Sequence, residues 1–204
     1  MTTLDKPAPT ATSRPVWVSA AVVAGLLVFD LVASWGLLHY ARSEGWSFWD
    51  SIALDCIPGL GYAAVVAVRG LDPVRRILAA GAALGYAAAA ASPGLVFRAL
   101  AETEHLEPGS VRIVGWVYSL VLPTLVVLAW CLARRRGSLW PLGLLVTLVV
   151  AAAVYQGRDW AFDLLPSPIT NLDAHIAVIA VLGWIPMLAG GLTAWALERL
   201  QPGQ

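Results

Sequence analysis

The chain has 204 residues, of which 59% are hydrophobic and only 13% are charged, and its mean hydropathy is +0.73. A soluble domain of this length needs more polar surface, so the composition excludes that class and predicts an integral membrane protein. The net charge is zero, which gives no basic field to indicate nucleic acid as a partner. Frequent Ala, Val, Leu, Arg and Gly with a single Lys suggests a GC-rich coding source, so the expected location is a bacterial plasma membrane.

Long apolar runs predict an all-α, polytopic transmembrane helix bundle of about six spans, with both termini in the cytoplasm. A polar, Pro- and Thr-rich tail at residues 1–15 precedes a six-helix domain at 16–199, and a short tail at 200–204 follows it. The first run lacks a small-x-small cleavage site, so it is expected to stay as a helix. The expected spans are 16–40, 48–68, 73–100, 111–133, 139–156 and 172–197.

Two spans carry internal signals of their own. Pro58 with the two glycines that follow predicts a kink or local unwinding in the second span. In the third span, Gly81, Gly85 and Ala89 follow a small-xxx-small spacing that lets helix backbones approach closely. That spacing predicts the central packing face of the bundle or, alternatively, a face for homo-oligomer formation.

The basic residues fall into two sets when they are counted loop by loop, and the larger set is expected on the cytoplasmic side. Nine are assigned to that side and four to the other. The nine are Lys6, Arg14, Arg69, Arg75, Arg76, Arg134, Arg135, Arg136 and Arg199, and the four are Arg42, Arg98, Arg112 and Arg158. Ten of the thirteen acidic residues and all three histidines accompany the smaller set, so the chemistry of the protein is expected to face outward.

Two aspartates interrupt the first two spans and form the main candidate site. Asp30 lies ~13 Å along its helix from the outer boundary at ~1.5 Å per residue, where an unpaired carboxylate is costly. Asp55 is expected at a similar depth on the neighbouring antiparallel helix, and Ser34 and Tyr62 share the faces of the two aspartates. The pair would line a water-accessible pocket that binds a cation, carries a proton or acts as acid and base. Alternatively, Arg98 or Arg112 neutralises one aspartate as an internal strut.

The fourth and sixth spans add further candidates at the outer face. Arg112 and Trp116 lie one turn apart and would present a cation and an indole to a pocket, or else anchor the helix at the interface. Asp173 and His175 open the sixth span, and both would ligate a metal only if the helix began after Asp173. We therefore predict no metal site and no cofactor.

The last outer segment, 157–171, is expected to be a loop stiffened by Pro166 and Pro168 that folds back over the bundle as a lid. It carries Arg158, Asp159 and Asp163.

Three functions remain open. The first is transport or binding of a small solute, a cation or a proton in an outward-facing polar pocket built from Asp30, Asp55, Arg112, Trp116 and His175. The second is an enzyme acting on a lipid or isoprenoid, with Asp30 and Asp55 as catalytic acid and base. The third is an accessory subunit of a larger membrane complex. The expected partners are the lipid bilayer, a small-molecule or lipid ligand, and further copies or partner subunits.

Overall fold

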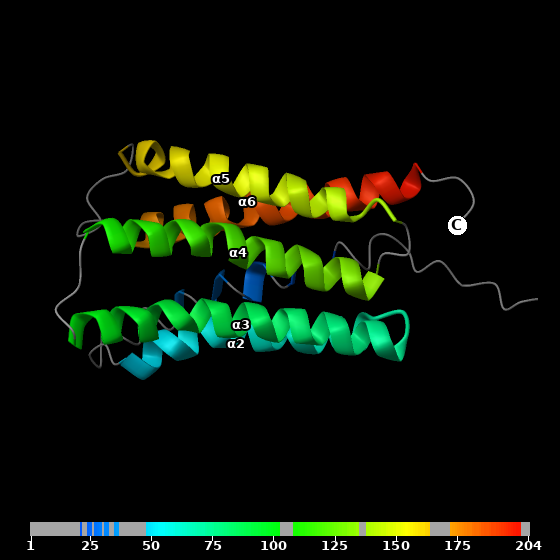
Figure 1. Ribbon diagram of the computed structural model, residues 1–204, viewed down its shortest axis with the longest axis horizontal. Coiled ribbons are helices and arrows are strands. Elements are labelled where there is room, and N and C mark those ends of the chain that lie inside the picture. Colours follow the sequence, from blue (N-terminus) through cyan, green and yellow to red (C-terminus); the bar gives the residue numbers. More distant parts are fainter. Residues whose placement is uncertain are drawn as a thin grey trace, which may run out of the picture.

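The computed structural model describes residues 48–102, 108–134, 138–163 and 172–200, together with separate helical residues between positions 21 and 36. Of the described residues, 94% are helical and none lies in a strand, which confirms the all-α bundle. Figure 1 shows the long helices lying side by side and antiparallel. Their bounds are α2 Phe48–Arg69, α3 Pro73–Glu102, α4 Pro108–Arg134, α5 Pro141–Asp163 and α6 Leu172–Arg199.

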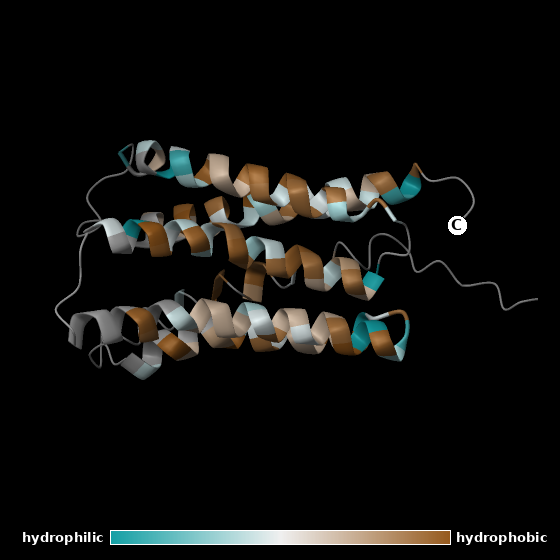
Figure 2. Cartoon of the chain, in the orientation of Figure 1, coloured by the Kyte–Doolittle hydropathy of each residue, from teal (hydrophilic) through white to brown (hydrophobic). Residues whose placement is uncertain are grey.

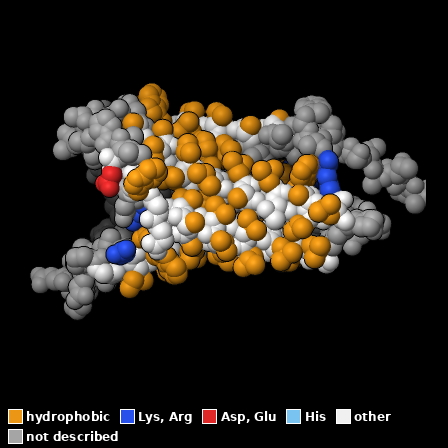
Figure 3. All heavy atoms as spheres, turned by 90° about the horizontal axis from the view of Figure 1, so that it is seen from above, with side chains coloured by type: hydrophobic (Ala, Val, Ile, Leu, Met, Phe, Trp, Pro, Cys, Tyr) orange, Lys and Arg blue, Asp and Glu red, His pale blue; other side chains and the backbone are white. Residues whose placement is uncertain are grey.

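Three of the described helical stretches are long and apolar enough to cross a membrane, and a shorter apolar helix runs from Cys56 to Arg69. The three are Arg112–Arg134, Pro141–Arg158 and Ala177–Arg199. Apolar residues cover the middle of the bundle and polar ones gather towards its ends (Figure 2). The face in Figure 3 likewise carries apolar side chains along its length and charged ones near the two ends. These features fit an integral membrane protein, because only a bilayer makes such an apolar exterior favourable.

The interior of the bundle is built mainly from small residues. Alanine dominates the buried positions, while many Leu, Ile and Val side chains point outward. Lipid tails solvate large apolar side chains as well as the protein interior does, so helices in a bilayer gain more from close backbone approach than from burying leucine. The buried alanines are Ala63, Ala79, Ala83, Ala87, Ala90, Ala91, Ala129, Ala133, Ala151 and Ala194.

Helix α4 contacts each of the other four long helices. Helices α2 and α3 form one closely packed pair and α5 and α6 form another, and within the described residues the two pairs meet only through α4. Figure 1 shows α4 between them. The site described below lies where α4 meets α5.

Glycines mark the closest helix crossings. A Cβ added at Gly190 on α6 would lie 1.8 Å from Oγ1 of Thr147 and 2.6 Å from the carbonyl oxygen of Gly143, both on α5. On α2, a Cβ at Gly59 would lie 2.6 Å from Cβ of Ala87 on α3. Glycine at these positions therefore allows the backbones to touch. α2 stays helical through Pro58, so the expected unwinding is absent, and Gly59 instead serves the contact with α3.

The packed face of α3 differs from the expected one. Ala79, Ala83 and Ala87 are buried against the neighbouring helices, whereas Gly81 is exposed and no described atom lies within 4 Å of a Cβ added at Gly81 or Gly85. The prediction that the spacing of Gly81, Gly85 and Ala89 marks the packing face within the bundle is therefore wrong. An alanine spacing of the same period runs along the opposite side of the helix, and α2 and α4 pack on that side.

Two hydrogen bonds join α2 and α3 to α4 inside the bundle. The hydroxyl of Tyr62 donates to the carbonyl oxygen of Val126 at 2.8 Å, and the hydroxyls of Ser92 and Tyr118 share a hydrogen bond. Tyr62 is 8% exposed. Each contact satisfies a phenol that would otherwise be costly to bury in an apolar surrounding.

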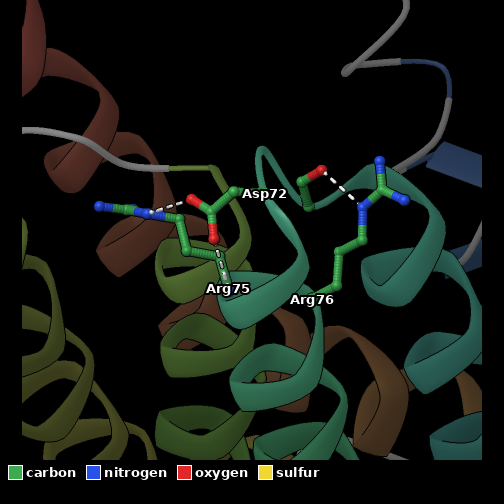
Figure 4. Close-up of polar contacts among 4 residues, drawn as sticks. Asp72, Arg75 and Arg76 are labelled. Carbon is green, nitrogen blue, oxygen red and sulfur yellow. Dashed lines mark hydrogen bonds and ion pairs between the residues drawn. The ribbon is translucent and has the colours of Figure 1, made fainter.

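Polar contacts stabilise the turn between α2 and α3 (Figure 4). Asp72 caps α3 by accepting from the backbone N–H of Arg75 at 2.9 Å, and Pro73 occupies the first helical position. Nε of Arg75 lies 3.2 Å from the Asp72 carboxylate, and Nε of Arg76 donates to the Gly70 carbonyl at 3.1 Å. The N–H of Leu71 donates to the carbonyl of Ala133 at 3.0 Å, which fastens the turn to the end of α4.

Gly190→Ala should lower the free energy of unfolding by about 1–3 kcal/mol, because the added methyl meets the backbone of α5 and forces the helices apart. Unfolding by a denaturing detergent, followed by circular dichroism, measures the loss. Gly191→Ala is the matched control, since no described atom lies within 4 Å of its Cβ position. Equal stability of the two variants would contradict the described crossing.

Tyr62→Phe should lower the free energy of unfolding by about 0.6–1 kcal/mol, because it removes the hydrogen bond to Val126 and keeps the ring. The same unfolding titration measures it. Unchanged stability would show that this hydroxyl contributes nothing to the fold.

Candidate functional site

The predicted site residues do not form one described cluster. Asp30 and Ser34 lie outside the described residues, so the predicted pairing of Asp30 with Asp55 stays a prediction. Asp55 lies on α2 and Asp173 and His175 lie on α6, but the structure does not describe their side chains. Because α6 already begins at Leu172, Asp173 and His175 are two positions apart within one helix, an arrangement that does not place two residues on one face.

Tyr62 lies in a packed cluster of buried residues, and its hydroxyl donates to the carbonyl oxygen of Val126. Among the side chains that the structure describes, no group of three His, Cys, Asp or Glu residues could hold a metal ion.

The other two predicted residues, Arg112 and Trp116, come together in a surface pocket between α4 and α5. Its lining is Arg112, Ile113 and Trp116 from α4 and Tyr155 and Gln156 from α5, and its volume is about 210 Å³. Arg112 and Trp116 share a side of α4 because they are one turn apart. The walls that the pocket exposes are apolar. The polar pocket expected around Asp30 and Asp55 stays a prediction.

Tyr155 joins the two helices at this pocket. Its hydroxyl donates to the backbone carbonyl of Arg112 at 3.0 Å, and it is 6% exposed. Gly115 lies beside this hydrogen bond, and a Cβ at that position would be in van der Waals contact with the tyrosine oxygen, at 3.4 Å.

Arg158 lies on the other side of the same phenol. Its Nη2 donates to the Tyr155 hydroxyl at 3.2 Å, and its guanidinium carbon lies 3.9 Å from the ring centroid, within the range of a cation–π contact. Tyr155 therefore accepts from Arg158 and donates to the backbone of Arg112. Tyr155 thus joins the side chain of Arg158 to the backbone of α4 at Arg112.

The pocket lies at the ends of two candidate membrane spans. Arg112 is the first residue of one span and Arg158 is the last residue of the next. Arg112 is exposed, and no acidic side chain among the described residues forms an ion pair with it. The guanidinium of Arg112, exposed beside apolar walls, gives the pocket a group that can bind an anion.

Arg112 and Trp116 were predicted from the sequence, whereas Tyr155 and Gln156 were not, and Arg158 was expected in a loop. The structure corrects that assignment, since α5 continues to Asp163 and carries Arg158 as a helical residue. The lid expected over 157–171 is therefore wrong for residues 157–163, and the rest of that segment lies outside the described residues. A usable signal was present in the spacing of Tyr155 and Arg158, three positions apart and thus neighbours on a helix.

No protein-family model, no curated protein and no solved structure matches this chain.

Proposed function

We propose that this protein is a multi-pass protein of the cell membrane that binds a small ligand in the pocket between α4 and α5 and transports it. The observation that carries the proposal is the assembly of Arg112 and Trp116 with Tyr155 into one pocket at the span ends. A pocket with apolar walls and a few fixed polar groups is the usual form of a small-molecule site. Asp30 and Asp55, on the first two expected spans, would serve the translocation step.

The proposed topology has six spans with both termini in the cytoplasm. The alternation of the described helices supports it, because arginines from four separate chain segments lie at one end of the bundle, namely Arg69, Arg75 and Arg76, Arg134, and Arg199. Arg112 and Arg158 lie at the other end. An excess of arginine marks the cytoplasmic side, so the pocket would open on the opposite side.

Cysteine labelling tests the topology in a chain carrying Cys56→Ala and Cys131→Ala. A membrane-impermeant maleimide added to whole cells should label Asp163→Cys, at the pocket end of α5. It should label Ser138→Cys, before the other end of α5, only after the membrane is opened. Thr2→Cys should behave like Ser138→Cys. Labelling of both α5 positions from outside would show that α5 does not cross, and the reverse pattern would invert the topology.

Ligand binding is tested by the unfolding temperature of the purified protein against a panel of small cations, anions and neutral solutes. A ligand present at 100 times its Kd stabilises the folded state by about 2.7 kcal/mol. Trp116→Ala should abolish the stabilisation, because Trp116 forms a wall of the pocket. Trp160→Ala is the matched control, since Trp160 lies on α5 near the same end and does not line the pocket.

Compounds that bind should then be taken up by proteoliposomes, and Asp30→Asn and Asp55→Asn should abolish uptake while the protein remains folded. If no compound stabilises the protein, or if Trp116→Ala and Trp160→Ala behave alike, the proposed function is wrong. Binding without uptake would restrict the function to binding.

A further inference from the structure

We propose that the pocket between α4 and α5 binds an anionic phospholipid, with the phosphate held by Arg112 and Arg158 and the upper part of an acyl chain against the apolar walls. This inference rests on the proposed ligand-binding role of the same pocket and names the class of ligand.

The depth of Arg112 and Arg158 in the membrane favours a ligand from the headgroup layer. Arg112 and Arg158 are the terminal residues of the apolar runs Arg112–Arg134 and Pro141–Arg158. The ends of such runs meet the layer of lipid headgroups, so both guanidinium groups belong at the level of the phosphates. A ligand of the headgroup layer reaches them without leaving the membrane.

The charge of the two arginines favours a ligand that carries a phosphate. Arg112 lines the pocket from α4, and the guanidinium of Arg158 is held over the ring of Tyr155, which lines the pocket from α5. Each of the two helices therefore brings one cation to this end of their contact. Arginine binds phosphate oxygens through paired N–H groups and carries its charge at every physiological pH.

The apolar surroundings favour a lipid over a soluble anion. Ile113 is 66% exposed and Trp116 is 42% exposed, and both lie beside Arg112 in the pocket. Inorganic phosphate would leave these apolar walls uncovered, whereas a lipid covers them with its own chain. The volume of about 210 Å³ is smaller than the ~300–1,000 Å³ of sites that enclose a whole drug-sized ligand. Only part of the lipid therefore enters, and the rest lies along the helix surface.

The test measures binding of three probes to the detergent-purified full chain by microscale thermophoresis. The probes are dihexanoyl phosphatidylglycerol, dihexanoyl phosphatidylcholine and inorganic phosphate. We expect the phosphatidylglycerol probe to bind at least about tenfold more tightly than the phosphatidylcholine probe, which corresponds to about 1.4 kcal/mol. Inorganic phosphate should bind more weakly than either lipid.

Variants then assign the preference to the pocket. Arg112→Gln should weaken binding of both lipid probes and of phosphatidylglycerol more strongly, so that the tenfold preference is lost. Arg112→Lys, which keeps the charge, should retain most of the preference. Arg199→Gln is the matched control, because Arg199 also lies over an aromatic ring, 4.2 Å from the centroid of Trp195, at the other end of the bundle. Trp116→Ala should weaken both lipid probes alike.

Equal binding of the two lipids, or equal effects of Arg112→Gln and Arg199→Gln, would overturn the proposal. Inorganic phosphate binding as tightly as phosphatidylglycerol would assign the site to a soluble anion. A dimer that Arg112→Gln dissociates would assign this face to a second copy of the chain. Either result overturns the lipid proposal. If the lipid preference is absent but another compound binds in a Trp116-dependent manner, this inference fails and the proposed function stands. If no compound and no lipid binds in that manner, both fail.

Discussion

The fold depends on α4, the helix that every other long helix contacts. Hydrophobic burial holds soluble bundles together, but between helices in a bilayer it offers little, since lipid and protein are equally apolar. Close backbone contact and a few hydrogen bonds must provide the specificity instead. Tyr62 and Tyr155 donate to carbonyl groups of α4, and Tyr118 on α4 bonds to Ser92 of α3, so α2, α3 and α5 are each joined to α4 by a phenol.

The need for close backbone contact between helices also explains the distribution of small and large residues. Alanine and glycine occupy the helix crossings, because a larger side chain there would separate the backbones, as the contact between Gly190 and Gly143 shows. Leucine, isoleucine and valine are left for the exterior. At the pocket, Tyr155 bonds the backbone of α4 through its hydroxyl and carries Arg158 over its ring.

Much of the fold could be predicted from the sequence, because a bilayer requires long apolar runs and these are visible without a partner. The helical class is confirmed, whereas the end of α5 was missed because Gly157, Arg158 and Asp159 resemble a loop in composition. The packing face of α3 was misjudged because two small-residue spacings coexist on one helix, and only the position of α2 and α4 decides between them. At the site, helical spacing was sufficient to group Arg112 with Trp116. Tyr155 could not be added, because its place depends on how α5 lies against α4.

The way α5 is held has a mechanical consequence. Near the arginine-rich end it touches α6 backbone to backbone through Gly143 and Gly190, and near the pocket it is joined to α4 by the hydroxyl of Tyr155. The contact between Gly143 and Gly190 leaves no space between the two backbones, whereas the Tyr155 contact is a single hydrogen bond beside an open pocket. Because the glycine contact makes α5 and α6 move together, the change in the spacing of α4 and α5 that needs the least repacking is a rotation of the pair about the cluster of Val127, Cys131 and Ala194, which joins the pair to α4. In such a rotation the helices move least at one face of the membrane and most at the other, where Arg112 and Arg158 lie.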